Sequence, residues 1–117
     1  MGVRQALGRW GEDLAAARLE EAGLRVVERN WRCAEGEIDI VAADGGTLVV
    51  CEVKTRSGPG FGDPAEGIDR AKEARLRRLA LRWMAAHGTG WRELRFDVVT
   101  VVRSRDGVTV RHLRGAF

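Results

Sequence analysis

The sequence predicts an α/β domain in which helices flank one mixed β-sheet. Two segments place apolar residues at helical spacing, and five short segments have the alternating or continuous apolar pattern of strands. Glycine-containing turns help to separate these segments, which follow the order helix, three strands, helix, two strands. With 117 residues, 44% of them hydrophobic and 32% charged, the chain is expected to form a single domain over residues 1–117.

The N-terminal part is predicted to be a helix followed by a strand. The helix spans residues 4–22 and ends at Gly23, because glycine commonly stops a helix at its C-terminal end. The first strand spans residues 24–32, which include Val26, Val27 and Trp31. The predicted buried stripe of the helix consists of Leu7, Trp10, Gly11, Leu14, Ala15, Arg18 and Ala22.

A β-hairpin and a glycine-rich loop follow. Residues 37–43 and 47–55 alternate polar and apolar side chains, as half-buried strands do. Between them, Asp44, Gly45 and Gly46 form a sequence typical of a tight hairpin turn. Residues 57–64 are predicted to be a connecting loop, or a loop that closes over a nucleic acid and stacks Phe61 on a base.

The C-terminal half is predicted to be a helix and two strands. The helix spans residues 65–87 and ends at Gly88. Residues 94–102 are a continuous apolar strand, consistent with burial on both faces, and Asp97 within it needs an arginine or a backbone donor as partner. A turn over residues 105–107 leads to the last strand, residues 108–113. The predicted core stripe of the helix consists of Ile68, Leu76, Leu79, Ala80 and Trp83.

The composition excludes several classes of protein. No apolar run reaches the roughly 18–20 residues that span a bilayer, and the first ten residues lack the apolar centre of a signal peptide. The two cysteines, Cys33 and Cys51, form no CxxC pair, and the two histidines lie far apart. Neither a disulfide framework nor a zinc site is therefore predicted. We expect a soluble, cytoplasmic protein with no membrane partner.

The two strands of the hairpin bring acidic side chains together. If residues 45–46 form a two-residue turn, paired residue numbers sum to 91 and Asp39 faces Glu52. If the turn is at residues 44–45, the sum is 89 and the two carboxylates share a face with an offset of two residues. Facing Cβ atoms lie about 4.5–5.5 Å apart, close enough for two carboxylates to share one divalent cation. In the first register the opposite face pairs Ile38 with Val53, Ile40 with Cys51, and Ala42 with Val49.

The polar face of this hairpin predicts metal-assisted chemistry. Like charges that face each other across a sheet are destabilising, and Mg²⁺ would relieve the repulsion because it prefers carboxylate oxygens and keeps several waters. Lys54 would lie beside the cation and orient a water or stabilise a pentavalent phosphorus. Glu12, on the border of the first helix's buried stripe, would complete the shell. The alternative is a solvated face with an ion pair between Glu37 and Lys54.

Basic residues of the hairpin and of the second helix predict contacts with phosphates. The net charge is +3, which is compatible with a polyanionic partner. Of the twenty basic residues only Lys54 and Lys72 are lysines, which suggests that these two positions need a compact ammonium. Lys72 lies on the core-facing stripe of the second helix, either as a phosphate-binding amine or as a lysine that reaches solvent past the helix end. Arg56 and Arg75 are further predicted phosphate contacts.

These motifs resemble those of a known superfamily. Asp39, twelve intervening residues and then Glu52-Val53-Lys54 resemble the PD-(D/E)XK nucleases, although Ile38 stands where many members have proline before the aspartate. Nearly the whole chain is similar to the YraN-like family of small uncharacterised bacterial proteins, which is related by fold to archaeal Holliday-junction resolvases. The matching stretches are Gly11-Glu12, Arg29-Asn30-Trp31-Arg32, Gly36-Glu37-Ile38-Asp39, Glu52-Val53-Lys54-Thr55-Arg56, Lys72 with Arg75-Leu76, and Arg95-Phe96-Asp97-Val98.

The resemblance implies a restriction-endonuclease-like fold and a nuclease site. Asp39 and Glu52 would bind Mg²⁺ or Mn²⁺, Glu12 would assist them, and Lys54 would be the catalytic lysine. We expect a DNA endonuclease that acts on branched or structured DNA, and a homodimer, since two copies would cover both strands. The alternatives are a nucleic-acid-binding module of the same fold without activity and a protein-interaction domain, because a fold alone does not establish activity.

Overall fold

Five strands form one mixed sheet in the order β1-β2-β3-β4-β5. The computed structural model describes residues 2–58 and 69–117. The chain order of helices and strands is the predicted one, so the α/β class with a five-stranded mixed sheet is confirmed and is consistent with a restriction-endonuclease-like fold. The elements are α1 (Val3–Glu21), β1 (Arg25–Cys33), β2 (Gly36–Asp44), β3 (Thr47–Ser57), α2 (Arg70–His87), β4 (Glu93–Ser104) and β5 (Gly107–Leu113).

One parallel pair lies at the centre of this sheet. β3 and β4 run parallel, and the other three pairs are antiparallel. A parallel pair requires a crossover connection, and the chain between β3 and β4 includes α2. β4 is buried over Phe96–Val99, which confirms the prediction of an apolar strand covered on both faces.

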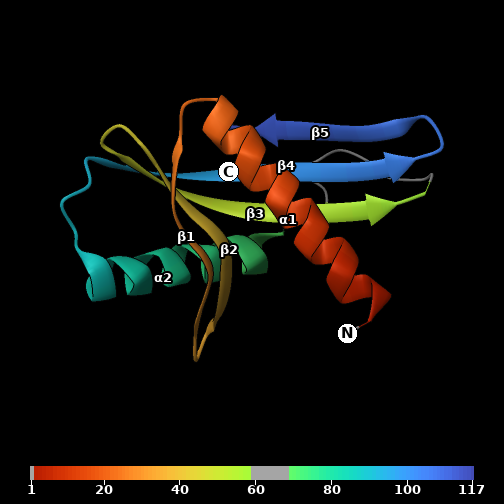
Figure 1. The fold of residues 1–117 in the computed structure, drawn as a ribbon. Coiled ribbons are helices and arrows are strands. Elements are labelled where there is room, and N and C mark those ends of the chain that lie inside the picture. Colours follow the sequence, from red (N-terminus) through yellow and green to blue (C-terminus); the bar gives the residue numbers. More distant parts are fainter. Residues whose placement is uncertain (1, 59–68) are drawn as a thin grey trace.

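Each face of the sheet is covered by one helix (Figure 1). On one face, Ala15, Ala16 and Leu19 of α1 pack against buried residues of β2, β3 and β4. On the other face, α2 packs against β2, β3 and β4 through its predicted core residues Leu76, Leu79, Ala80 and Trp83. Because both faces are covered, the sheet centre has apolar side chains on both sides.

The buried stripe of α1 differs from the predicted stripe. Arg18 and Ala22 were expected in the core and are exposed, whereas Ala16 and Leu19 are buried. Gly11 and Glu12 are buried as well. The face of α1 that contacts the sheet is therefore rotated from the predicted stripe and includes Ala15 and Ala16. These small side chains allow the helix to approach the sheet closely.

The start of α2 also differs from the prediction. The helix begins at Arg70 and not at residue 65, because the Asp69 side chain caps it by accepting a hydrogen bond from the backbone N–H of Lys72 at 2.8 Å. Ile68 and the loop residue Phe61 lie outside the described residues. The predicted closing of that loop over a nucleic acid stays a prediction.

The β2–β3 hairpin has the register expected for a turn at residues 45–46. Asp44 pairs with Thr47, and Ile40 pairs with Cys51. The predicted pair of Ile38 and Val53 is wrong, since Ile38 packs in the α2 core and Val53 against the α1 core. The side chains of Ile38 and Ile40 therefore point to opposite faces of the sheet. Ile38 lies outside the part of β2 that pairs with β3, which begins at Ile40.

Two further expectations concern the cysteines and the membrane. Cys33 and Cys51 are free thiols, and Cys51 is buried in the α1 core as a small apolar side chain. Within residues 2–58 and 69–117, neither helix combines the length and the apolar character that a bilayer crossing requires.

Candidate metal centre and its surroundings

Asp39 lies where β2 and β3 separate. We call this place, with Asp39, Glu52 and Val53, the fork. The ladder between these strands stops at the pair of Ile40 and Cys51, so the expected facing pair of Asp39 and Glu52 is not part of it. Instead, the backbone N–H of Val53 donates a hydrogen bond to Oδ2 of Asp39 at 2.8 Å. The Asp39 carboxylate thus binds the β3 backbone just beyond the last residue pair between β2 and β3.

Negative charge accumulates around Asp39. Burial is the largest influence on this carboxyl group and the charge of Glu52 the second, and together they raise the pKa of Asp39 to about 7. Glu12 and Glu37 add to the effect, while the hydrogen bond from Val53 opposes it. The charge of Glu52 therefore acts on Asp39, although the two residues are not a pair of the ladder. Burial and the neighbouring carboxylates therefore disfavour the charged form of Asp39.

Glu52 forms an ion pair with a lysine of α2. Nζ of Lys72 lies 2.6 Å from Oε1 of Glu52, and the two side chains are 26% and 14% exposed. Lys72 precedes the buried residues Leu76 and Leu79 by one and two helical turns, so it points towards the sheet. The predicted placement of Lys72 on the core-facing stripe is correct, and the lysine contacts a carboxylate of the candidate site.

Lys54 follows Glu52 by two residues on β3 and is half-buried. Loss of solvent lowers the pKa of the Lys54 ammonium, and the positive charge of Lys72 lowers it further, while Glu52 acts in the opposite direction. Two lysines therefore lie near one glutamate. The partial burial of Lys54 is compatible with a role beside a phosphate.

Glu12 reaches the neighbourhood of the fork from α1. The Oε1 atom of this buried side chain accepts hydrogen bonds from Nε of Arg29 at 2.8 Å and from Nδ2 of Asn30 at 2.9 Å. Asn30 has a φ of 55°, a left-handed conformation that asparagine tolerates better than most residues. Sequence reasoning assigned no role to Arg29 or Asn30, although the family resemblance included both residues.

A cleft of about 720 Å³ opens between α1 and the fork. Its volume is within the range of small-molecule sites. Glu12, Asp39, Val53 and Thr55 line it together with arginines and amides of α1 and β1. Neither Glu52 nor Lys54 is in this lining. The cleft therefore gives access to Asp39 from the α1 side, and the lysines approach from the α2 side.

Gly11 allows α1 to lie close enough to β3 to form this cleft. A Cβ atom at position 11 would lie 1.9 Å from Oγ1 and 2.9 Å from Cβ of Thr55, a distance that no side-chain rotation of Thr55 relieves. Because Gly11 directly precedes Glu12, this close approach also sets the position of the Glu12 carboxylate.

Gly11→Ala is expected to destabilise the protein by about 1–3 kcal/mol or more, because overpacking forces the helix away from the sheet. Gly8→Ala is the matched control, since nothing lies within 4 Å of a Cβ at position 8. In the exposed helix interior it should stabilise by up to about 1 kcal/mol. Urea unfolding of both variants measures the difference, and equal stability would contradict the tight contact with Thr55.

The donor atoms at the fork fit a hard divalent cation. In the described ranges 2–58 and 69–117, no group of three or more His, Cys, Asp or Glu side chains is placed to hold a metal ion. Glu12, the expected third ligand, is bound to Arg29 and Asn30. Mg²⁺ nevertheless needs only one or two carboxylates, because waters complete its shell. Asp39 and Glu52 would supply these, and the cation would offset the negative charge that accumulates around Asp39.

The chain is similar over almost its whole length to proteins of one family. Residues 11–101 match the profile described as "Uncharacterised protein family UPF0102". The chain is 57% identical over 116 residues to a UPF0102 protein of Beutenbergia cavernae, with 98% of both chains covered. It is 53% identical over 126 residues to a UPF0102 protein of Acidothermus cellulolyticus, with 98% of this chain and 96% of the relative covered. The chain belongs to the UPF0102 family.

The resemblance to the YraN-like family is thereby confirmed for this UPF0102 protein. The family match covers residues 11–101. It includes the fork residue Asp39 as well as Glu12, Glu52, Lys54 and Lys72. The family description assigns no activity, so the roles of these residues are proposals.

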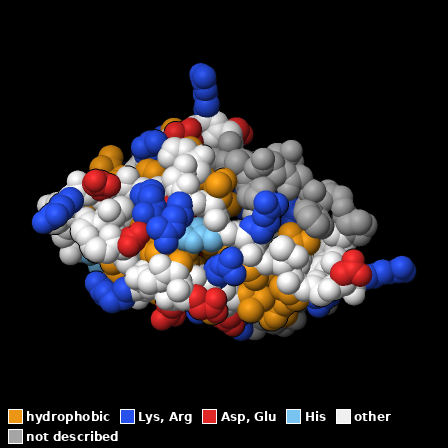
Figure 2. All heavy atoms as spheres, turned by 90° about the horizontal axis from the view of Figure 1, so that it is seen from above, with side chains coloured by type: hydrophobic (Ala, Val, Ile, Leu, Met, Phe, Trp, Pro, Cys, Tyr) orange, Lys and Arg blue, Asp and Glu red, His pale blue; other side chains and the backbone are white. Residues whose placement is uncertain are grey.

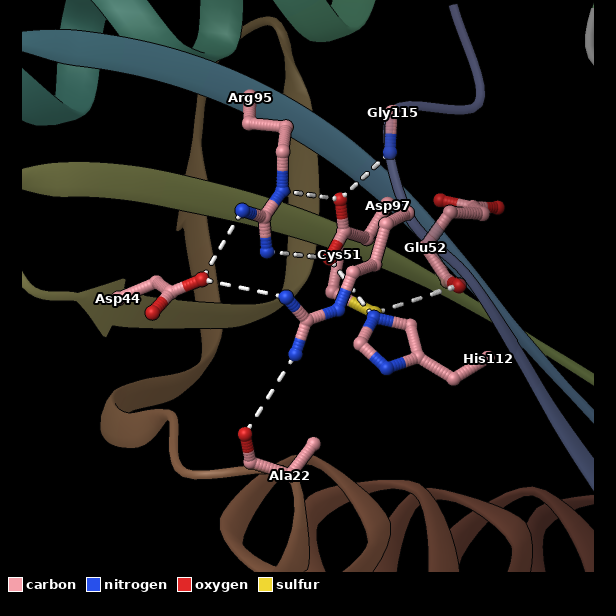
Figure 3. A network of polar contacts seen from close by, with 9 residues as sticks. Ala22, Asp44, Cys51, Glu52, Arg95, Asp97, His112 and Gly115 are labelled. Atoms are coloured by element: carbon pink, nitrogen blue, oxygen red, sulfur yellow. Dashed lines mark hydrogen bonds and ion pairs between the residues drawn. The ribbon is translucent and has the colours of Figure 1, made fainter.

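A second buried carboxylate of this UPF0102 protein, Asp97 on β4, is a structural anion (Figure 3). Arg95 bonds both of its oxygens at 2.9 and 3.1 Å, Nε2 of His112 lies 2.7 Å away, and the backbone N–H of Gly115 donates at 3.0 Å. Burial opposes ionisation, but these hydrogen bonds outweigh it and lower the pKa of Asp97 to about 2. An arginine and a backbone donor were the predicted partners, and only His112 was not foreseen.

The arginines of α2 are partly neutralised by glutamates. Arg77 pairs with Glu73, while Arg78 and Arg82 both pair with Glu35 in the β1–β2 turn. The predicted phosphate contacts Arg56 and Arg75 are exposed, and their role stays a prediction. Seen from the side of β5, Lys and Arg side chains lie close to a histidine near the middle of that face, with acidic side chains among them and along one edge (Figure 2).

Proposed function

We propose that this UPF0102 protein is a nuclease that hydrolyses phosphodiester bonds in DNA, with Mg²⁺ or Mn²⁺ held by Asp39 and Glu52. The observation that carries the proposal is the fork between β2 and β3, where a partly buried aspartate lies beside a glutamate that has two lysines near it. A divalent cation would bind both carboxylates, and the lysines near Glu52 suit a phosphate.

The reaction adds water across one P–O bond. The oxygen of the water bonds to phosphorus, the bond to the leaving sugar oxygen breaks, and that oxygen receives a proton. A divalent cation, when bound, lowers the pKa of a water and offsets charge on the phosphoryl oxygens. Lys54 donates a hydrogen bond to the phosphate as its charge grows. Glu12, held by Arg29 and Asn30, keeps a further carboxylate facing the cleft.

The substrate we propose is branched or structured DNA. This follows from the relation in fold to Holliday-junction resolvases, and exposed basic residues of β3 and α2, including Arg56 and Arg75, would contact phosphates outside the cleavage site. A homodimer would present two such sites to the two strands. Linear, nicked, flapped and four-way DNA, and RNA, incubated with Mg²⁺ or Mn²⁺, test the substrate class directly.

Lys54→Ala is expected to lower DNA cleavage by about 10²–10³-fold, because it removes a charged donor from the transition state. The exposed turn residue Arg105 provides a control, as Arg105→Ala removes the same charge far along the chain. Cleavage by Lys54→Ala at the wild-type rate, with no cleavage by Asp39→Ala, would assign the metal site and remove the lysine from the mechanism. Cleavage by Asp39→Ala would contradict the proposal itself.

A second candidate function is a DNA-binding module without activity. One observation favours it: the described residues contain no cluster of three or more metal-binding side chains. Such a module would bind DNA with an affinity that falls steeply with salt. Its binding would be indifferent to Mg²⁺ and to Lys54→Ala, and no substrate of the panel would be cut.

A further inference from the structure

Lys72 forms an ion pair with Glu52, the carboxylate that the proposed function assigns to a divalent cation. Its Nζ lies 2.6 Å from Oε1 of Glu52, and Glu52 is only 14% exposed, so the pair is largely shielded from water. An ion pair in such surroundings is stronger than a surface pair, which contributes little. In the structure, therefore, the counter-charge of Glu52 is an ammonium from α2.

The helix holds this lysine at a defined point. Asp69 caps the first turn by accepting the Lys72 N–H at 2.8 Å, and Leu76 and Leu79 fix the same helix face in the core. The backbone of Lys72 is thus anchored, while its four-carbon side chain can rotate. An ammonium is a compact point charge without a preferred plane, so it can exchange one anion for another nearby.

The charges around Glu52 make a second cation compete with Lys72. Lys54 follows Glu52 by two residues on β3, so the two side chains leave the strand on the same face, towards which Lys72 also points. Asp39 accepts the N–H of Val53, the residue after Glu52, at 2.8 Å and is the second carboxylate of the fork. A dication beside both carboxylates would satisfy Asp39 as well as Glu52, and it would repel Lys72 and Lys54.

We propose that Lys72 is a counter-ion that gives up Glu52 when a divalent cation binds, and that the released ammonium then binds a phosphate of the substrate. The inference rests on the proposed function. Lys72 is in this account a positioning residue for substrate, and its contact with Glu52 neutralises that one carboxylate while no cation is bound. A chain with eighteen arginines retains lysine here because a planar guanidinium would hold the carboxylate too firmly.

Lys72→Met tests the exchange, because methionine keeps an apolar side chain of similar length and removes the charge. Mn²⁺ binding to the full chain, measured by calorimetry without DNA, should become roughly tenfold tighter. DNA cleavage at saturating Mn²⁺ should show a raised KM. Arg82→Met is the matched control, since Arg82 lies on the same helix and pairs at 2.6 Å with Glu35, outside the site. Its Mn²⁺ affinity should equal that of the wild type.

A second variant keeps the test independent of folding. Lys72→Arg retains the charge and can bind Glu52 through two N–H groups, so it should weaken Mn²⁺ binding relative to the wild type. Unchanged or weaker Mn²⁺ binding by Lys72→Met, with thermal unfolding like the wild type, would overturn the exchange. Tighter binding with an unchanged KM would overturn the phosphate contact. If the wild type itself bound no Mn²⁺, the proposed function would fail together with this inference.

Discussion

Asp39→Asn is expected to unfold at a higher temperature than the wild type at pH 8, although it should have lost all DNA cleavage. The pKa of Asp39 is about 7 in the folded protein and about 3.9 in an unfolded chain. Between these values the folded state binds more protons than the unfolded state, so the stability of the wild type falls as the pH rises from about 4 to 7. Asparagine removes this charge and can still accept the N–H of Val53.

The size of this effect follows from the shift. One pKa unit corresponds to about 1.4 kcal/mol, so the variant should gain on the order of 2–4 kcal/mol at pH 8 without a divalent cation. At pH 4 the two proteins should be nearly equal. Thermal unfolding at both pH values measures the gain, with Asp106→Asn in the exposed β4–β5 turn as a control within about 0.5 kcal/mol of the wild type.

The same variant separates stability from metal binding. Millimolar Mn²⁺ should raise the unfolding temperature of the wild type, because a ligand that binds only the folded state stabilises it. It should leave Asp39→Asn unchanged. A variant that is less stable than the wild type at pH 8 would refute the unfavourable surroundings of the Asp39 charge, and Mn²⁺ stabilisation that persists in it would exclude Asp39 as a ligand.

Asp97→Asn is expected to destabilise the protein by about 3–5 kcal/mol, the effect of breaking a buried charge network by removing one partner. Asp97 is fully buried and accepts from Arg95, His112 and Gly115. Asparagine has nearly the same volume, but its NH₂ group would face donors where an acceptor is needed. Urea unfolding at pH 7 measures the loss.

The fall of the free energy of unfolding at low pH provides a second test of the role of Asp97. The pKa of Asp97 is about 2 when folded and about 3.9 when unfolded, so its contribution is complete above pH 4 and is lost as the pH falls towards 2. Asp44→Asn is the control, since Asp44 also binds Arg95 but is 33% exposed, and it should cost at most about 1 kcal/mol. Equal effects of the two variants would contradict the central role of Asp97.

Local pattern was sufficient for the order of the elements, and it reduced the hairpin register to two alternatives, of which the structure has the one with the turn at residues 45–46. Alternation along residues 37–43 and 47–55, with two glycines between them, predicted that Ile40 pairs with Cys51, and this pair is present. Helical spacing predicted that Leu76, Leu79 and Trp83 are buried and that Lys72 lies on their face. These properties depend on neighbours within about one helical turn or across one tight turn, which the sequence states directly.

The structure differs from the predictions made from the sequence where several helices and strands meet. The fork at Asp39 exists because the hairpin must cover two cores at once, with Ile38 packed towards α2 and Ile40 towards α1. No alternation pattern predicts where a strand leaves its partner. Arg29 and Asn30 were missed for the same reason, since their roles depend on the position of Glu12 on a helix seventeen or eighteen residues earlier.

The sequence by itself determined the class of fold, the order of its elements, the two possible registers of the central hairpin and the residue types that approach one another. Only the tertiary structure decided that Asp39 bonds the backbone of Val53, that Glu52 pairs with Lys72, and that Glu12 is held by Arg29 and Asn30. The physical reason is that periodicity sets which side of an element a residue faces. The partner it meets there depends on how α1 and α2 pack against opposite faces of the twisted sheet.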